Sequence, residues 1–440
     1  MATVIGGGVA GITAALELAD RGYRVRLFES RPRLGGRAFT LPEKPGQLAI
    51  DNGPHVILGR YREFRKLIRR IGTEGLFDQA KSLTLGTVDE RGQTAELRLG
   101  PGFAPLKFPL AILRHGALKP GERLRALLGL GAVLLGAGAK TDGEAWCRSR
   151  WQNGGPRRVI WDPMSRAIMN AELSEIAITE LLRTLRMAFL GSGREAAIWI
   201  PKAPWSEIIG DAAERALVDA GVYVSCGTRI ERLVGIDERD GRVSTIRFAT
   251  GTPGHTGTGP YELVVLAAPW QQTARFLSLA APERQELDAT RLEPSAIVSV
   301  YFESDDDTGL PELDLVSLLG DDPFDFFCRR AGAPRGQFAV LSGGGRGLDG
   351  LSVAEIGERA REQLLAHYPG AEGIAEARLR VTKEARATFV CRPGGPTRPK
   401  PGPWRGLPLL RLCGDWTDTG LPATLESAAL SARMALADLD

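Results

Sequence analysis

The chain of 440 residues is poor in the residues that form disulfides or bind metals, with five cysteines and four histidines. The cysteines are scattered, odd in number and contain no CxxC pair, so the sequence predicts neither a disulfide framework nor a zinc site, and we expect no bound metal. An expected strand at residues 3–5 leaves no room for a signal peptide. Together these features predict a cytoplasmic protein.

A large excess of one charge is also missing. The chain has 56 basic and 53 acidic residues, which leaves a formal net charge of +3. A polyanionic partner would require a much stronger basic bias. We therefore expect no nucleic-acid partner.

No apolar run reaches the roughly 18 to 20 residues that span a bilayer. The longest run, residues 126–139, is rich in Leu, Ala and Gly. It predicts either a buried helix or a helix that lies in the plane of a membrane surface. The second interpretation predicts peripheral contact with the inner face of the cytoplasmic membrane, and it draws on nearby basic residues, namely Lys107, Arg114, Lys119, Arg123 and Arg125.

A glycine-rich turn follows the first expected strand, with the sequence Gly6-Gly7-Gly8-Val9-Ala10-Gly11. Gly6 permits a tight turn, Gly8 lets the backbone approach a pyrophosphate, and Gly11 allows the next helix to pack closely. The start of that helix, at Val9 and Ala10, offers free amides to an anion. Glu29 follows the second expected strand, where an acceptor for ribose hydroxyls belongs. The turn therefore predicts a dinucleotide site.

The stretch from Glu29 to Arg37, with the sequence ESRPRLGGR, resembles the large FAD family of amine oxidases, protoporphyrinogen oxidases and phytoene desaturases. In that family the stretch continues past the adenosine toward the flavin. The resemblance implies FAD as the cofactor and an amine oxidase-like α/β fold. It also assigns to the cofactor Glu29, Ser30, Arg31, Arg33, Gly35, Gly36 and Arg37.

Two later segments fit the same resemblance. Near the C-terminus, Gly414-Asp415 follows an expected strand, and the family uses this aspartate to accept a bond from the ribityl chain. Pro422 suits the first turn of a helix that would direct its positive end at the flavin. The remaining cofactor residues that the resemblance implies are Ile230, Ala268, Leu421, Ala423 and Thr424.

The order of expected elements predicts a Rossmann-type FAD-binding domain interleaved with an α+β substrate-binding domain. Strands are expected at 3–5, 24–28, 222–225, 230–233, 243–246, 263–267 and 409–412, helices after the glycine turn, from an N-cap at Ser206, and over 423–439. Residues 60–200 are expected to be mainly helical, and an irregular α+β block is expected from about 285 to 400. We assign residues 1–70, 205–280 and 405–440 to the FAD-binding domain, and 71–204 and 281–404 to the substrate-binding domain.

Residues 51–61 and 414–426 narrow the resemblance to the hydroxysqualene dehydroxylases, which act in hopanoid synthesis. That resemblance places Gly53, Pro54 and His55 beside the flavin. The sequence departs from the group at Pro54, where glutamine is usual, and at 324–328, where a Gln-Trp motif is replaced by FDFFC. Both positions are expected to face the substrate.

The resemblance implies a reductive reaction, in which an allylic hydroxyl leaves hydroxysqualene, a C30 isoprenoid, and squalene forms. His55 is the candidate proton donor, because imidazole titrates near neutrality; the alternative is a structural histidine bonded to backbone. An oxidative desaturase or amine oxidase acting on another polyene or amine is a second hypothesis. A third is a carrier of prenylated proteins without cofactor. No motif identifies the external electron donor.

Overall fold

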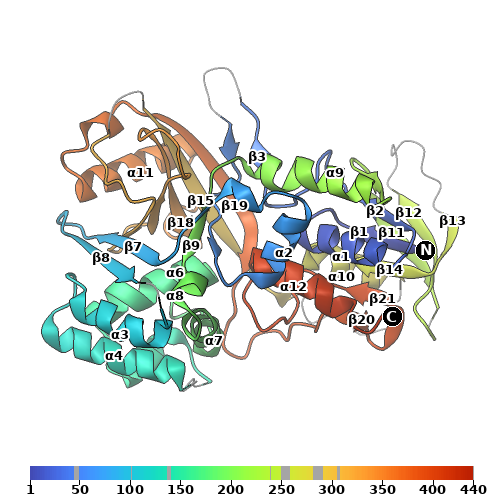
Figure 1. Cartoon of the computed structure of the whole chain (residues 1–440), viewed down its shortest axis with the longest axis horizontal. Coiled ribbons are helices and arrows are strands. Elements are labelled where there is room, and N and C mark those ends of the chain that lie inside the picture. Colours follow the sequence, from blue (N-terminus) through green and yellow to red (C-terminus); the bar gives the residue numbers. More distant parts are fainter. Residues whose placement is uncertain are drawn as a thin grey trace.

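The computed structural model places the flavin-type sheet at one end of the molecule and a larger sheet with a group of helices at the other (Figure 1). Both chain termini lie at the first end. The described residues are 1–43, 49–100, 102–135, 140–237, 239–248, 258–280, 291–304 and 308–439.

The first sheet has six strands, and all pairs but one are parallel. In sheet order the strands are β10 (Tyr223–Ser225), β2 (Val25–Phe28), β1 (Ala2–Ile5), β14 (Leu263–Leu266), β21 (Leu407–Leu412) and β20 (Gly402–Trp404). Every residue of β14 is buried, as expected for a strand covered on both faces. The edge strand β20 pairs antiparallel with β21.

Alternate residues of these strands pack on opposite faces of the sheet. Val4 and Val265 face one core with helices α1 (Val9–Asp20), α9 (Ala212–Asp219) and α12 (Leu425–Ala435). Ile5 and Leu266 face a second core that includes residues of helix α10 (Trp270–Ala280) and of a three-stranded sheet. That sheet contains β11 (Ile230–Ile236), β12 (Val243–Phe248) and β13 (Thr258–Tyr261). This is the layered α/β arrangement that the sequence predicts.

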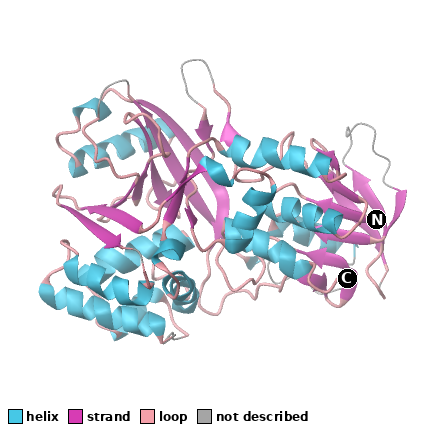
Figure 2. Cartoon of the chain, viewed as in Figure 1, coloured by secondary structure: helices cyan, strands magenta, loops and turns pink. Residues whose placement is uncertain are grey.

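The second large sheet has seven strands and lies at the end of the molecule far from the termini (Figure 2). In sheet order they are β19 (Arg378–Phe389), β15 (Pro294–Glu303), β18 (Gln337–Gly343), β17 (Phe326–Cys328), β16 (Leu315–Leu318), β7 (Leu83–Val88) and β8 (Thr94–Leu99). Two small sheets contain β3 (Thr40–Leu41) with β4 (Ile50–Asp51), and β5 (Ile57–Leu58), β9 (Ile198–Pro201) and β6 (Phe77–Gln79).

The expectation of a mainly helical region from 60 to 200 is wrong over residues 77–99. There β6 pairs with β9, and β7 and β8 form an antiparallel hairpin at the edge of the seven-stranded sheet. The hairpin is stabilised by pairing with β16, which lies more than 200 residues later in the chain. The local pattern of apolar residues cannot indicate a partner strand that lies so far away in the sequence.

The remaining helices surround the seven-stranded sheet or cover the flavin-type sheet. They are α2 (Arg62–Arg70), α3 (Ala104–Arg114), α4 (Pro120–Leu134), α5 (Gly143–Ser149), α6 (Asp162–Met169), α7 (Ile178–Phe189), α8 (Gly193–Ala196) and α11 (Val353–His367). Figure 2 shows α3 and α4 grouped below the strands, at the end far from the termini. Residues 136–139 of the long apolar run lie outside the described residues.

Two expected helix starts need correction. Ser206 is not an N-cap but the first residue of a π-helical turn (Ser206–Asp211), which continues into α9. Its hydroxyl accepts the amide of Thr40 instead, at 3.0 Å. The last helix begins at Leu425 rather than Ala423, with Thr424 as its N-cap. The expected boundary near residue 285 lies outside the described residues, and the division into two domains stays a prediction.

Candidate functional site

The carboxyl edge of the six-stranded sheet gathers the predicted cofactor residues. Gly6 follows β1, Glu29 follows β2, Ala267 follows β14 and Cys413 follows β21. Backbone bonds hold these strand ends in register: Ala267 donates to Ile5 at 2.9 Å and Cys413 to Leu266 at 3.0 Å. Ligands of open parallel sheets bind at such an edge.

The glycine turn leaves no room for side chains at two of its positions. Gly6 has a φ of +113°, and a Cβ there would lie 2.6 Å from the carbonyl oxygen of Ala267. A Cβ on Gly11 would lie 1.8 Å from the oxygen of Gly6. The turn and the helix after it therefore depend on glycine at both positions.

The N-terminus of α1 has backbone amides that find no acceptor within the helix. The first bond of the helix runs from the amide of Ile12 to the carbonyl of Gly8, at 2.9 Å. The amides of Val9, Ala10 and Gly11 precede that bond and have no acceptor within the helix. Within this described turn no side chain caps the helix and no acidic residue is present. Such an end suits a pyrophosphate.

The Glu29 side chain is buried beside this turn, with 8% of its surface exposed. One carboxylate oxygen accepts the amide of Gly7 at 2.7 Å, and the other accepts the amide of Arg31 at 2.8 Å and the hydroxyl of Ser30 at 3.2 Å. These bonds fix the carboxylate, and the oxygen that accepts the Gly7 amide has a second lone pair left for a ligand. Glu29 is therefore positioned to accept ribose hydroxyls.

The stretch after Glu29 returns to the glycine turn. A Cβ on Gly36, whose φ is +62°, would lie 3.1 Å from the Cα of Gly8. Arg31 and Arg33 both donate to the Gly36 carbonyl, at 2.9 and 3.3 Å. Burial and the charge of Arg31 lower the pKa of Arg33 to about 10, and its guanidinium stacks 3.4 Å over the ring of Phe39. Two cations are thus held next to the proposed pyrophosphate position.

Arg37 joins the two ends of the chain. Its guanidinium bonds Asp415 at 2.7 Å and also donates to the carbonyl of Ala387. Burial alone would lower the pKa of Arg37, but Asp415 and Glu384 outweigh it and raise the pKa. The amide of Gly414 donates to the Ser431 hydroxyl of α12 at 2.8 Å. The structure therefore brings two predicted residues, 378 positions apart, into direct contact.

The remaining predicted cofactor residues lie around the same edge. Leu421 and Pro422 are buried in the loop before α12, where Thr424 accepts the amide of Ser427 at 3.0 Å. Pro422 therefore precedes the N-cap and does not occupy the first helical turn. Ala423 is partly buried beside the core of the three-stranded sheet.

Ile230 and Ala268 have structural contacts of their own. Ile230 opens β11 and packs in a core with Phe28, while the nearby amide of Thr228 donates to the backbone oxygen of Glu29 at 2.8 Å. The carbonyl of Ala268 accepts the indole N–H of Trp416 at 3.0 Å. The roles of both residues toward FAD stay predictions.

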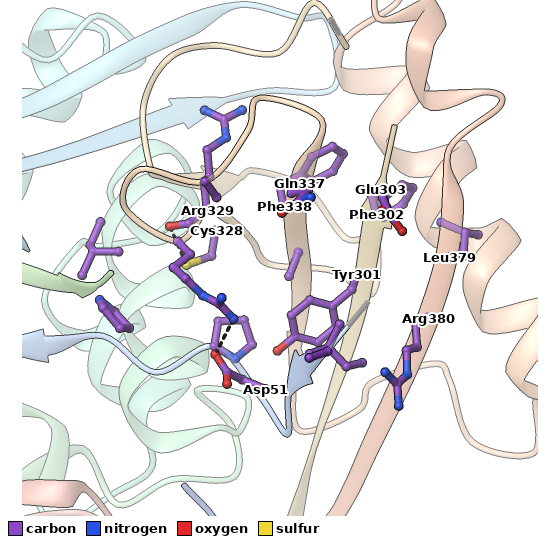
Figure 3. A pocket seen from close by; sticks show the side chains of 18 of the residues that line it. Asp51, Tyr301, Phe302, Glu303, Cys328, Arg329, Gln337, Phe338, Leu379 and Arg380 are labelled. Atoms are coloured by element: carbon purple, nitrogen blue, oxygen red, sulfur yellow. Dashed lines mark hydrogen bonds and ion pairs between the residues drawn. The ribbon is translucent and has the colours of Figure 1, made fainter. Parts of the chain in front are cut away.

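A pocket with an empty volume of about 850 Å³, its open mouth included, lies against the seven-stranded sheet (Figure 3). Half of its lining is apolar, and the lining residues are Ala49, Ile50, Asp51, Pro54, His55, Ile200, Pro201, Tyr301, Phe302, Glu303, Cys328, Arg329, Arg330, Ala333, Gln337, Phe338, Ala339, Arg378, Leu379 and Arg380. None of them comes from residues 103–139.

Asp51 fixes one side of the pocket. One carboxylate oxygen accepts the hydroxyl of Thr40 at 2.7 Å and the amide of Trp205 at 3.1 Å. The other pairs with Arg330 at 3.2 Å, the contact drawn as a dashed line in Figure 3. Asp51 is buried, so this pair is partly shielded from solvent. It ties the 51–55 loop to the strand side of the pocket.

The 51–55 loop connects the pocket with the carboxyl edge of the six-stranded sheet, which carries the predicted FAD residues and which we call the flavin edge. The carbonyl of Asn52 accepts the hydroxyl of Thr382 in β19 at 2.9 Å, and its side-chain amide donates to Glu384 at 3.2 Å. A Cβ on Gly53 would lie 3.7 Å from the hydroxyl of Ser299 in β15. The side-chain amide of Asn52 also donates to the Arg37 carbonyl at 3.5 Å, so the loop contacts both Arg37 and the sheet, and the place of Gly53, Pro54 and His55 beside the flavin stays a prediction.

His55 lines the pocket and packs edge-on against Trp205, with ring centroids 5.3 Å apart. Burial and the charge of Arg37 lower the pKa of His55, while Asp51 and a hydrogen bond with the Arg37 backbone partly offset them. The imidazole is therefore neutral at pH 7. The hydrogen bond with the Arg37 backbone is also what a purely structural histidine would make, so that alternative stays open.

Tyr301 is a pocket residue that the sequence does not single out. Its ring points from β15 toward the side of the pocket where Asp51 lies (Figure 3). Its hydroxyl is buried and has no hydrogen-bond partner among the described residues. Burial, with the charge of Asp51, raises its pKa well above the ordinary value, so the phenol keeps its proton. The signal in the sequence is weak: alternation in β15 places Val300 and Phe302 in the core and Tyr301 on the other face.

The structure treats Pro54 and residues 324–328, the two positions expected to face the substrate, differently. Pro54 lines the pocket, but within 324–328 only Cys328 does, and burial raises the pKa of its thiol to about 12. Phe324 and Phe327 are buried in the core of the substrate side. Asp325 is buried between Arg166 and Arg346. The expectation that the whole stretch faces the substrate is wrong for these three residues.

The described part of the chain lacks both a metal-binding cluster and a membrane-spanning helix. It contains no group of three His, Cys, Asp or Glu residues that could hold a metal ion. It also contains no helix with the length and apolarity that crossing a membrane requires.

Comparisons with known proteins place the chain among flavoproteins. The family described as flavin containing amine oxidoreductase matches residues 9–439. Hydroxysqualene dehydroxylase of Rhodopseudomonas palustris is 29% identical over 99% of this chain and 97% of that protein. The protein of the same name from Sinorhizobium fredii is 28% identical, with the same coverage.

Solved structures share the fold. An oxidoreductase from Methanosarcina mazei has a TM-score of 0.69 at 18% identity, over 98% of both chains. Cyclohexylamine oxidase of Brevibacterium oxydans has a TM-score of 0.66 at 15% identity, again over 98% of both chains.

Proposed function

The chain belongs to the family of flavin-containing amine oxidoreductases and is an FAD-dependent oxidoreductase, and from that premise we propose that it reductively removes the allylic hydroxyl of hydroxysqualene to give squalene. The observation that carries the proposal is similarity to hydroxysqualene dehydroxylases over nearly the full length of both chains. The half-apolar lining of the pocket suits a polyene.

FAD would be held by the edge of the six-stranded sheet. The free amides of Val9 to Gly11 would bind the pyrophosphate, Glu29 the ribose, and Asp415 the ribityl chain. Arg31 and Arg33 add positive charge near the phosphates. When bound and reduced, FAD supplies the hydride that replaces the hydroxyl.

The reaction breaks a C–O bond and forms a C–H bond. The hydroxyl leaves as water, so it must take a proton, and the hydride brings both electrons. An external reductant must return two electrons to FAD for each turnover.

Two groups on the pocket wall can hold that proton. His55 is the donor that the sequence predicts, and as a neutral imidazole it offers only its N–H. Tyr301 is the second candidate, because its buried phenol is protonated and unpaired among the described residues. Asp51, paired with Arg330, would position the loop that bears His55.

The reactant and product dissolve in lipid rather than in water. We therefore propose that the enzyme works in peripheral contact with the inner face of the cytoplasmic membrane. The described residues contain several exposed leucines, which are consistent with such contact.

The decisive test is anaerobic. The flavin is reduced with dithionite, hydroxysqualene is added in detergent, and flavin absorbance and products are followed. We expect one squalene for each flavin that is reoxidised. If the flavin stays reduced, while the oxidised protein is bleached by phytoene, dehydrosqualene or an amine, the oxidative alternative is correct. A protein that is colourless when purified would favour the carrier.

Variants of the two proton donors refine the test. Loss of the donor should slow reoxidation by about 100-fold while FAD stays bound. His55→Gln and Tyr301→Phe are compared with Tyr368→Phe, which removes another buried, unpaired hydroxyl outside the pocket lining. The donor is the residue whose variant alone shows this loss, and equal rates in all three would leave neither residue as the donor.

A further inference from the structure

Helices α3 and α4 expose large apolar side chains to solvent. Leu106 is 73% exposed, Leu128 is 56% exposed and Leu135, at the end of α4, is 82% exposed. Their exposed neighbours are Phe103, Leu110, Leu113 and Leu124. Single exposed leucines are ordinary, but a group on adjacent helices marks an interaction site. We call these seven residues the leucine face.

The leucine face points away from the protein. Leu106, Leu110 and Leu113 recur at intervals of four and three residues, which is one side of α3. Phe108 and Ile112, on the opposite side of α3, pack in one core with Ala126 and Leu130 of α4. Because both helices bury their inner sides in the same core, their outer sides face solvent together. Figure 1 shows the two helices side by side at the end of the molecule far from the termini.

Positive charge is concentrated in the same segment. Residues 101–140 contain six Lys or Arg and one acidic residue, Glu122, a surplus of five positive charges, whereas the whole chain has a net charge of +3. Lys107 and Arg114 are exposed on α3, and the described residues provide neither with an ion pair. An apolar face bordered by cations matches an anionic lipid surface.

An exposed tryptophan lies near the leucine face. Trp151 is 70% exposed, and its carbonyl accepts a bond from Arg125 of α4 at 3.5 Å. It has a φ of 56°, which is unusual for a residue with a large side chain. Tryptophan concentrates at the boundary between lipid and water.

The charge also decides between two occupants. A second copy of this chain, docked face to face, would bring two basic segments together, and their repulsion would oppose the contact. A bilayer with anionic headgroups would attract both the cations and the leucines.

We propose that the leucine face, together with Trp151, docks on an anionic lipid bilayer with α3 and α4 parallel to the membrane surface. The inference rests on the proposed function for the reason to visit a membrane, and on the exposed residues for the place of contact. None of the leucine face lines the pocket described above, so docking and chemistry use separate residues.

The test is flotation of the full-length holoprotein with vesicles. Vesicles of phosphatidylglycerol and phosphatidylcholine should carry the protein upward, and pure phosphatidylcholine vesicles should carry about tenfold less. Leu128→Asp should reduce the bound fraction about tenfold. The matched control is Val218→Asp, since Val218 is 59% exposed on α9 in the other part of the molecule.

Three results would overturn the proposal: no flotation of the parent, equal flotation of Leu128→Asp and the parent, or equal loss in Val218→Asp. Light scattering without lipid tests the rival occupant, and a dimer that Leu128→Asp abolishes would also overturn it. Turnover of substrate in detergent separates the two proposals. A parent that floats but does not reduce hydroxysqualene leaves the docking surface valid and contradicts the proposed function.

Discussion

The flavin edge and the pocket against the seven-stranded sheet use different parts of the chain. At the flavin edge the predicted hydrogen-bond donors are backbone amides. Glycines there let neighbouring backbone segments come so close that a Cβ atom would not fit between them. In the pocket, side chains from β4, β9, β15, β17, β18 and β19 and their adjoining loops meet across long sequence distances, as Asp51 and Arg330 do. A backbone site needs a contiguous motif, whereas a side-chain site needs only a fold that brings residues together.

We therefore expect the flavin edge to tolerate amino-acid substitutions less well than the pocket does. Gly11→Ala would place a Cβ 1.8 Å from the oxygen of Gly6. We expect a loss of about 3 kcal/mol in the free energy of unfolding, with loss of bound FAD. Flavin absorbance of the purified protein and urea denaturation measure both.

Gly131→Ala is the control for this substitution. Gly131 also lies within a helix, but a Cβ there would meet nothing within 4 Å. Alanine should therefore stabilise the helix by up to about 1 kcal/mol. A Gly11→Ala protein that stays yellow and as stable as its parent would contradict the account of the glycine turn.

The pocket should lose activity without losing FAD. Asp51→Asn leaves Arg330 without its carboxylate, and the 51–55 loop loses its charged contact. We expect kcat/KM to fall about tenfold to a hundredfold, because a charged hydrogen bond contributes about 1.5–3 kcal/mol. Steady-state kinetics and the FAD content of the purified variant test this.

Glu303→Gln is the matched variant, since Glu303 pairs with Arg378 in the same pocket at 2.9 Å, and that arginine is more exposed. Its effect should be smaller, because solvent screens exposed pairs. Loss of FAD from Asp51→Asn would show that the two regions do not separate as proposed.

The smallest expected effect is on acid stability. Burial, with the charge of Arg123, lowers the pKa of His115, and its Nδ1 accepts the amide of Ala117 at 3.3 Å. The unfolded chain therefore takes up this proton at a higher pH than the folded protein does. The contribution of this pKa difference to the free energy of unfolding is fully present above the ordinary pKa of histidine. It is lost as the pH falls through that pKa toward the lowered pKa of the folded protein. His115→Gln should reduce that loss, measured as the difference in unfolding free energy between pH 7.5 and 5. His55 adds the same dependence at the pocket, so the double variant should be flatter still, and an unchanged slope would contradict the assignment.

The sequence predicts the flavin edge in detail because its signals are local. A strand, a glycine turn and an acid at a set distance indicate one βαβ unit, and the structure places Gly6, Gly11 and Glu29 as that unit requires. The contact between Arg37 and Asp415 was beyond local reasoning, although both residues belong to motifs. Only the resemblance to a family placed them at one cofactor.

The pocket was harder to predict for a physical reason. Tyr301 and Arg330 stand in no motif, and their importance comes from neighbours that the seven-stranded sheet provides. The same sheet explains the error at 77–99, because β7 and β8 complete an edge whose other strands come from the second half of the chain. The stretch 324–327 was expected to face the substrate because related proteins have a Gln-Trp motif there, whereas the structure buries Phe324, Asp325 and Phe327 among core residues and arginines.

The order of strands in the flavin-type sheet has a consequence for how the protein is made. β21 pairs directly with β14, and α12 packs on α1, so the segment after residue 400 completes the sheet that residues 2–5 begin. Glu426 of α12 also accepts the amides of Glu63 and Phe64 at the start of α2. All strands of the seven-stranded sheet lie before residue 390, so β20, β21 and α12 are synthesised after that sheet. A chain that ended before β21 would therefore keep every strand of the seven-stranded sheet, but it would lack Asp415 and the helix that packs on α1.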